Sequence, residues 1–352
     1  GTTASCVWIP SSSGSPYSLT AAYSGDANYQ NSTSSAVSYT IYPSITLSYS
    51  GISTTFGNAR TSAPTVSGGT GSTSAWTWSI VKDSDGSTVS GITISSSGTV
   101  QVSGSTSVNT YSMRVTALDT VGITKSAIIL ISVGLSSAAS PTISATEPTM
   151  TVGGTVHLTA NVISAATGTI TFKYGSTTIS GCSGVTISTG TATCSWTPTT
   201  SSGSPFSLTA VYSGDGSYSG ATSSSLSYTV APVGSFTYAT QSLHFGDGAT
   251  IVPTITGGVG GFSSWTVVNN VDSTSVAGVY INTAGTIVIS KNLSAGTWNL
   301  NITATDGLGI TGYGTLQVVI SQATTTMTLS VQTISNVQLT AGTLGRQVRL
   351  VA

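Results

Sequence analysis

The chain has 352 residues, only 5% of them charged, and a formal net charge of −1 at pH 7. Phosphate binding needs clustered lysine and arginine, so this composition argues against a nucleic-acid partner and against a polybasic membrane-binding surface. No run of about 18 apolar residues is present, so we expect no membrane insertion. Alternation of apolar and polar residues, together with 41 glycines, favours β-strands joined by tight turns.

The chain repeats itself at long range. Residues 15–41 read SPYSLTAAYSGDANYQNSTSSAVSYTI and residues 204–230 read SPFSLTAVYSGDGSYSGATSSSLSYTV. A second unit recurs at nearly the same spacing, because FGNARTSAPTVSGGTG at 56–71 matches FGDGATIVPTITGGVG at 245–260. Fixed-period similarity is the signature of a repeat architecture, so the chain is expected to alternate two module types, A and B.

Five segments are predicted in chain order. They are the half A module (1–42), the first B module (43–134), the complete A module (135–231), the second B module (232–321) and the tail (322–352). The tail is expected to hold the first strands of a further A module, because GTLGRQVRLVA at 342–352 resembles MTVGGTVHLTA at 150–160. The chain has no starting Met and no signal peptide, so we expect a subunit or a window on a longer repeat protein.

Each module has the pattern of a β-sandwich. The complete A module contains VHLTA at 156–160, ITFKY at 170–174, FSLTAVY at 206–212 and LSYTV at 226–230, with Gly- and Ser-rich turns between them. About seven strands in about 95 residues fit an immunoglobulin-like sandwich. The predicted fold is therefore all-β, with tandem immunoglobulin-like β-sandwich modules in an elongated array.

The A module, with TVGGTVHLTANV, ATGTITFKYG and an LTA-x-YSGD-x-x-Y segment, resembles the bacterial Ig-like repeats of large cell-surface proteins and adhesins. The B module, with PTVSGGTG, ISSSGTVQVSG and VTALDTVGIT, resembles the cadherin-like Ig domains often found beside them. Together the resemblances cover essentially the whole chain. They imply an extracellular, multi-domain surface protein and no chemistry.

The three cysteines are Cys6, Cys182 and Cys194. Cys182 and Cys194 lie twelve positions apart in what reads as two strands around a turn, so we predict a disulfide across that hairpin, which an exported compartment would allow. Cys6 occupies the position of Cys194 in the repeat, so its partner is expected outside the chain. Three cysteines offer too few ligands for a zinc site.

The residues that catalysis would need are scattered. His157 and His244 are the only histidines and lie in different module types, so no catalytic triad is expected and the chain is predicted not to be an enzyme. Asp83-Ser84-Asp85-Gly86 faintly resembles a calcium loop but lacks the later ligands of an EF-hand, so no cofactor is predicted and calcium is kept only as an alternative. Trp76 and Trp78 are possible glycan contacts, although aromatics at repeat-equivalent positions are more often core residues.

The predicted function is structural: a repeat segment of an extracellular stalk or filament at a cell surface. Low surface charge removes the repulsion between molecules, which suits a chain that packs against copies of itself or adjoining repeats. A further hypothesis is head-to-tail strand addition, in which residues 322–352 of one copy complete residues 1–42 of the next. The alternative function is an adhesin that binds a surface glycan or a host surface through module loops.

Overall fold

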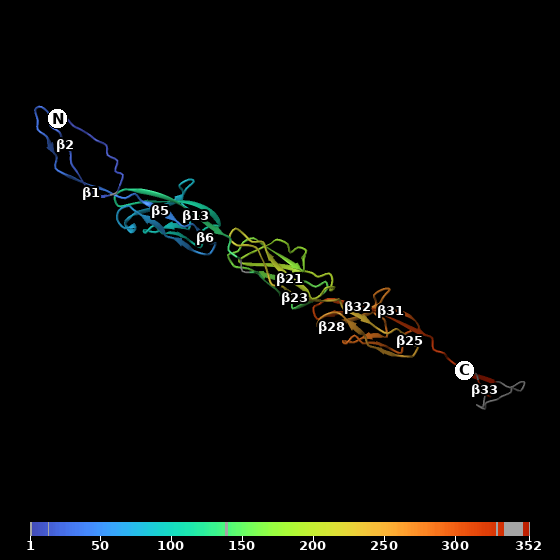
Figure 1. Cartoon of the computed structure of the whole chain (residues 1–352). Coiled ribbons are helices and arrows are strands. Elements are labelled where there is room, and N and C mark those ends of the chain that lie inside the picture. The colour runs from blue at the N-terminus through green and yellow to red at the C-terminus, as the bar shows by residue number, and fades with distance from the viewer. Residues whose placement is uncertain (1, 13, 138–139, 329, 334–347, 352) are drawn as a thin grey trace.

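The computed structural model describes every residue except 1, 13, 138–139, 329, 334–347 and 352. The described residues are all-β, with a single 3-10 turn at Thr73–Ala75. Three folded bodies follow one another in a row, and a thinner segment lies at each end (Figure 1). None of the described residues forms a helix with the length and hydrophobicity of a membrane span.

The first B module folds around its two longest strands. Its strands are β5 (Thr46–Tyr49), β6 (Ile52–Thr55), β7 (Arg60–Ser62), β8 (Pro64–Ser67), β9 (Thr77–Lys82), β10 (Ile92–Ile94), β11 (Val100–Val102), β12 (Asn109–Leu118) and β13 (Thr124–Gly134). Strands β6-β13-β12-β9 form one sheet, β10-β11-β7 a second, and β5 pairs with β8. On β12 alternate residues, among them Met113 and Val115, are fully buried, which is the period-two pattern of a half-buried strand.

The complete A module has two facing sheets. Its strands are β14 (Thr142–Ala145), β15 (Thr149–Thr151), β16 (Val156–Asn161), β17 (Thr169–Tyr174), β18 (Thr177–Thr178), β19 (Val185–Thr186), β20 (Thr191–Trp196), β21 (Phe206–Tyr212), β22 (Ala221–Thr222) and β23 (Leu226–Ala231). One sheet has the order β14-β16-β20 and the other contains β15-β23-β21-β17-β18. Leu158 from the first sheet and Phe172, Leu208 and Tyr212 from the second belong to one buried cluster between them.

The second B module repeats the plan of the first. Its strands are β24 (Ser235–Thr237), β25 (Gln241–His244), β26 (Ala249–Ile251), β27 (Thr254–Thr256), β28 (Phe262–Asn269), β29 (Val279–Ile281), β30 (Ile287–Ile289), β31 (Gly296–Asp306) and β32 (Thr311–Ser321). As in the first B module, the two longest strands pair antiparallel along their length, and a three-stranded sheet, β26-β30-β29, lies beside them. Phe236, Ile287 and Ile302 belong to its core.

The half A module forms two short pairs and exposes its aromatic residues. Strand β1 (Gly14–Leu19) pairs with β4 (Val37–Ile41), and β2 (Ala22–Tyr23) pairs with β3 (Ser32–Thr33). Tyr39 is 54% exposed, whereas its repeat counterpart Tyr228 is 2% exposed. Trp8 is 46% exposed, against 7% for its counterpart Trp196. The apolar face that is buried in the complete module is therefore open here.

The tail contains one described hairpin, β33 (Ser330–Thr333) with β34 (Val348–Val351). Ser330 pairs with Val351 and Val331 with Leu350. In the complete A module, Ser144 pairs with Thr159 and Ala145 with Leu158. Residues 330–331 of the tail therefore pair in the same register as residues 144–145 of the complete A module. Much of the GTLGRQVRLVA similarity, including residues 342–347, lies outside the described residues.

Candidate functional site

The YSGD-x-x-Y segment forms a locked loop after β21. The Asp215 carboxylate accepts hydrogen bonds from the backbone N–H groups of Ser217 (2.8 Å), Tyr218 (2.8 Å) and Thr167 (2.7 Å) and from the Tyr212 hydroxyl (2.8 Å). Short acidic side chains favour such turns because they satisfy nearby backbone donors. The preceding Gly214 has φ +78°, and a Cβ there would lie 2.7 Å from the Gly220 nitrogen, so the loop requires glycine at this position.

The same loop is present in the half A module. Asp26 accepts hydrogen bonds from the N–H groups of Asn28 (2.7 Å) and Tyr29 (2.9 Å) and from the Tyr23 hydroxyl (2.7 Å). The loop therefore keeps its conformation where the rest of the sandwich is absent. Its geometry comes from the motif itself and not from the surrounding core.

Hydrogen bonding sets the charge of the loop acid. Burial raises the pKa of the Asp215 carboxyl, but hydrogen bonds from Thr167, Ser217 and Tyr212 outweigh burial and hold that pKa well below its usual range. Burial, together with the hydrogen bond to Asp215, raises the pKa of the Tyr212 hydroxyl above its usual range. Asp215 is therefore charged and Tyr212 neutral, each in the state that their hydrogen bond needs.

The loop contacts the module before it. The Tyr218 ring meets the Phe56 ring edge to face, with centroids 5.7 Å apart and planes at 81°. Beside this contact, the Ser136 N–H donates to the Ser217 carbonyl (2.9 Å) and the Ser219 N–H donates to the Ser136 carbonyl (2.9 Å). The short connection between the first B module and the complete A module is thus paired, through its backbone, with the YSGD-x-x-Y loop.

A different contact joins the complete A module to the second B module. The Thr151 hydroxyl donates to Asp306 Oδ2 at 2.6 Å, and both residues are buried. The same carboxylate accepts the N–H groups of Val259, Leu308 and Ile310. Burial raises the pKa of Asp306, but the hydrogen bonds from Thr151 and Ile310 outweigh it and hold the pKa below its usual range.

The matching acid of the first B module has a different donor. Asp119 Oδ2 accepts both the N–H and the hydroxyl of Thr70, each at 3.0 Å, and Oδ1 accepts the N–H groups of Val121 and Ile123. Val259 occupies the repeat position of Thr70 and has no hydroxyl to donate. Thr151 of the neighbouring module takes that role in the second B module.

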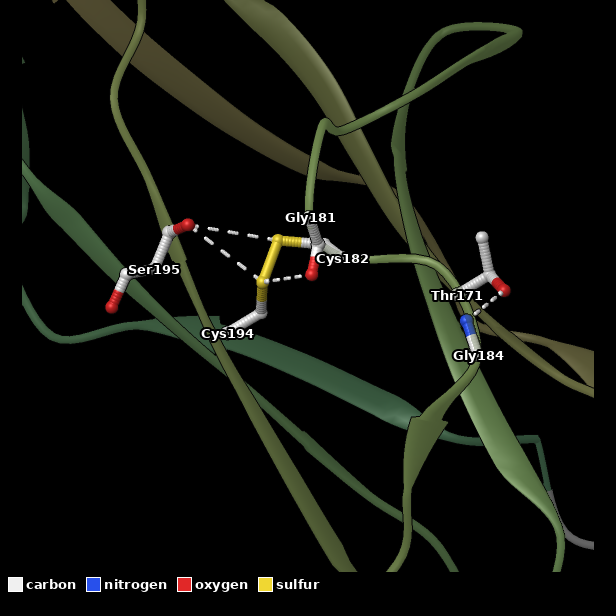
Figure 2. Close-up of a disulfide and its surroundings, with 6 residues drawn as sticks. All are labelled: Thr171, Gly181, Cys182, Gly184, Cys194 and Ser195. Carbon is white, nitrogen blue, oxygen red and sulfur yellow. Dashed lines mark hydrogen bonds between the residues drawn. A yellow bond between two sulfur atoms is a disulfide. The ribbon is translucent and has the colours of Figure 1, made fainter.

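Cys182 and Cys194 form a disulfide in the complete A module, with Cα atoms 5.7 Å apart (Figure 2). The bond ties the segment after β18 to β20. Beyond Cys182, the Gly184 N–H donates to the Thr171 hydroxyl (3.1 Å), which holds that segment against β17. Cys6 is exposed and not in a disulfide. A partner for Cys6 outside the chain stays a prediction.

The two tryptophans singled out as glycan contacts stack on each other, with centroids 5.8 Å apart. Trp76 is 5% exposed and its indole N–H donates to the Thr70 carbonyl (2.7 Å), so its ring belongs to the core of the first B module. Trp78 is half-buried, and its indole N–H donates to the Thr73 carbonyl (2.9 Å). A glycan contact would therefore fall to Trp78 alone, and it stays a prediction.

The aspartates and histidines that the sequence analysis singled out form local pairs in the described structure. In the part of the chain that the structure describes, no three side chains of His, Cys, Asp or Glu gather as metal ligands would. Asp83 forms an ion pair with Arg114, and Asp85 accepts hydrogen bonds from Ser87. His157 contacts Glu147 at 2.7 Å, and His244 lies 3.7 Å from Asp247.

Sequence reasoning missed the contacts between modules. Phe56 recurs as Phe245, and Tyr218 recurs as Tyr29, at equivalent positions of the repeat. The recurrence of these aromatic residues is the one sequence signal for the contact. It does not distinguish an aromatic residue of the core from one that contacts a neighbouring module. The Thr151–Asp306 contact has no local signal, because its two residues are 155 positions apart.

Residues 143–231 match the family model of the bacterial Ig-like domain (group 3). No curated protein matches the chain. A titin I-band fragment is 15% identical, covering 81% of this chain and 99% of that chain with a TM-score of 0.42.

Two further solved structures are similar. The N-terminal eight Ig domains of Down Syndrome Cell Adhesion Molecule are 13% identical, covering 87% of this chain and 40% of that chain with a TM-score of 0.42. A structure from a 1.5-MDa bacterial ice-binding adhesin is 15% identical, covering 80% of this chain and 99% of that chain with a TM-score of 0.32. The chain is an all-β array of tandem immunoglobulin-like sandwiches, and its residues 143–231 match a bacterial Ig-like domain.

Proposed function

We propose that this chain is a structural spacer segment of an extracellular stalk or filament at a cell surface, built from A modules and cadherin-like B modules. The observation that carries this proposal is the end-to-end row of sandwiches (Figure 1), joined by the Phe56–Tyr218 and Thr151–Asp306 contacts. A disulfide in a small sandwich is typical of oxidising, extracellular compartments. The length of the segment increases with each module that is added in the same direction, which is what a spacer needs.

An extended shape in solution is the first expected result. A compact protein of this length would have a radius of gyration of about 20 Å. Because the modules follow one another in a row, small-angle X-ray scattering should give a radius more than about twice that value. Light scattering on the same sample supplies the mass, so that extension is separated from association. A radius near that of a compact protein would contradict the spacer function.

The open face of the half A module supports strand addition as the way in which the array continues. In the complete A module, the residues equivalent to Trp8 and Tyr39 belong to a core that also contains Leu158 of β16 and Phe172 of β17. We propose that strands equivalent to β14–β19 cover the half A module in the same way. The β33–β34 hairpin of another copy reproduces the β14–β16 register and supplies part of this complement.

The complement needs more than that hairpin. Residues 161–188 of the complete A module, which include β17 and Cys182, have no sequence counterpart in residues 1–42 or 322–352. Residues 322–352 of another copy therefore cannot supply an equivalent of β17, the strand that carries the fully buried Ile170 and Phe172. The proposed complement accordingly includes a β17 equivalent from the adjoining repeat, whose cysteine would pair with Cys6.

A peptide titration tests this completion. A peptide of residues 142–188, added to the whole chain, should slow amide exchange of β1 and β4, since it supplies every missing strand. A control peptide of residues 142–160 lacks β17 and should protect the same amides far less. Equal protection by both peptides, or none by either, would contradict the proposed complement.

Adhesion to a surface glycan is the second candidate function. One observation favours it: a hollow of about 370 Å³ on the complete A module is lined in part by Tyr174, Trp196 and Phe206. Trp196 and Phe206 are buried there, whereas Tyr174 is partly exposed, so a sugar would contact the Tyr174 ring. A glycan array probed with the whole chain and with Tyr174→Ala decides the matter. Signals that are absent, or unchanged by the substitution, exclude this site.

A further inference from the structure

We propose that the YSGD-x-x-Y loop of each A module is the joint to the B module before it, and that Phe245 receives the corresponding loop of the next repeat. This inference rests on the proposed spacer function. It assigns the contact that would restrict bending and rotation between neighbouring modules. The occupant of the Phe245 surface is the A module of a following copy of this repeat. Tyr29 marks the loop by which such a copy docks.

The joint inside the chain shows what docking requires. Phe56 is held at the end of the first B module, because its N–H donates to the Gly134 carbonyl (2.9 Å). Tyr218 is held by the loop acid, because its N–H donates to Asp215 and its carbonyl accepts the Asp215 N–H. The backbone that carries each ring is thus held by hydrogen bonds within its own module, so little backbone freedom is lost when the rings pack.

The backbone adds direction to the ring contact. Ser136 both donates to Ser217 and accepts from Ser219, which makes a short parallel bridge between the connection and the loop. Two such bonds on one residue fix the orientation of the connecting chain relative to the loop. A ring contact alone would leave the modules free to rotate about their common axis.

Both halves of the same joint are present, unpaired, elsewhere in the described chain. The Phe245 N–H donates to the Ser321 carbonyl (2.8 Å), as Phe56 does to Gly134, yet the Phe245 side chain is 48% exposed. The Tyr29 N–H donates to Asp26 (2.9 Å), as Tyr218 does to Asp215, yet Tyr29 is 71% exposed. Phe56 and Tyr218 are only partly exposed: they cover each other, and Tyr218 also packs against the core of the complete A module.

Ala323 occupies the place of Ser136 in the second connection. It is exposed, and its backbone N–H and carbonyl are the groups that Ser136 uses in the first joint, so no particular side chain is needed there. The second B module therefore exposes the Phe245 ring, and next to it the Ala323 backbone groups that could form the same bridge. The periodicity of the sequence and the exposure of these groups point to one occupant, a type A loop.

The internal joint is tested by a distance distribution. Spin labels at Lys125→Cys and Ser202→Cys, in a Cys6→Ser background, report on the first B module and the complete A module, and both sites are exposed. Phe56→Ala or Tyr218→Ala should broaden the distribution at least about two-fold, because the ring contact is lost. The double variant should add little further, and Tyr218→Phe should retain the narrow distribution.

Two matched controls are built into the repeat. Phe245→Ala and Tyr29→Ala remove the equivalent rings where no joint is formed, and should leave the distribution unchanged. Amide exchange of β21 confirms that the complete A module stays folded in each variant. Unchanged widths in folded Phe56→Ala and Tyr218→Ala would overturn the joint while leaving the extended scattering radius, and so the spacer function, intact.

The surface at Phe245 needs a chain that contains its partner. In an extended chain, with residues 1–321 followed by residues 135–352, Phe245 precedes a complete A module. Labels placed on either side of this new connection should give a narrow distribution that Phe245→Ala broadens. The same substitution has no such effect in the 352-residue chain. A broad distribution before substitution, or no change after it, would overturn the assignment of Phe245.

Discussion

Replacing Asp215 by alanine should lower the free energy of unfolding of the complete A module by about 3 kcal/mol. The substitution removes the acceptor for three backbone N–H groups and for the Tyr212 hydroxyl, whose side chain is only 1% exposed. A buried donor left without a partner costs about 1–3 kcal/mol, and charged acceptors make the stronger hydrogen bonds. Denaturant titration followed by amide exchange of β17 and β21 measures the loss.

The repeat provides the control for this substitution. Asp26→Ala removes the same loop acid from the half A module, where Tyr23 is exposed and no strand equivalent to β17 lies alongside among the described residues. Unfolding of residues 135–231 should not respond to it. Equal effects of Asp26→Ala and Asp215→Ala on that region would contradict the role assigned to Asp215.

Acid should weaken the same module through the same residue. Because the pKa of folded Asp215 is depressed, its contribution to stability is fully present above the unfolded pKa of about 3.9 and is lost as the pH falls below it. Stability of residues 135–231 should therefore be flat near neutral pH and decline in acid. Asp215→Asn should make that decline shallower, and an unchanged slope would argue against this assignment.

Loss of the disulfide is the second large effect. The double variant Cys182→Ala with Cys194→Ala should lower the free energy of unfolding of the complete A module by about 3 kcal/mol, since closing a loop of this length restricts the unfolded chain. The two residues are 12 positions apart, and the Cys182 side chain is fully buried. Thermal melts with and without a reductant measure the effect.

Reduction of the native chain should reproduce most of that shift, whereas the double variant should be insensitive to reductant. Cys6→Ala serves as the control, because Cys6 is exposed and outside any disulfide in the structure. A midpoint that stays constant when the native chain is reduced would show that the cross-link contributes little.

The sequence carries much of the fold because local pattern and long-range repetition agree. Strand alternation identifies β16 and β21, where buried residues alternate with more exposed ones. Repetition also anticipates that Tyr39 and Tyr228 occupy equivalent strands. It does not reveal that one is exposed and the other buried, because burial depends on strands that residues 1–42 do not contain.

The contacts between modules lie beyond such reasoning. Periodicity describes which face of a strand is apolar, but it does not orient one sandwich relative to the next. Thr151 reads as an ordinary strand residue, and Asp306 as a turn acid, until the structure brings them together. Trp76 illustrates the reverse case, since its proximity to Trp78 in sequence suggested a binding platform while packing placed it in a core.

The shared hydrogen bond between Thr151 and Asp306 makes two neighbouring folding units thermodynamically dependent. Asp119 obtains its hydroxyl donor from Thr70 of its own module, so the first B module is self-sufficient at this position. The buried carboxylate of Asp306, by contrast, loses the Thr151 donor whenever the complete A module unfolds or separates from the second B module. If this chain were pulled from its ends, the second B module could not separate from the complete A module without losing part of its own stability, whereas the first B module carries no such dependence at Asp119.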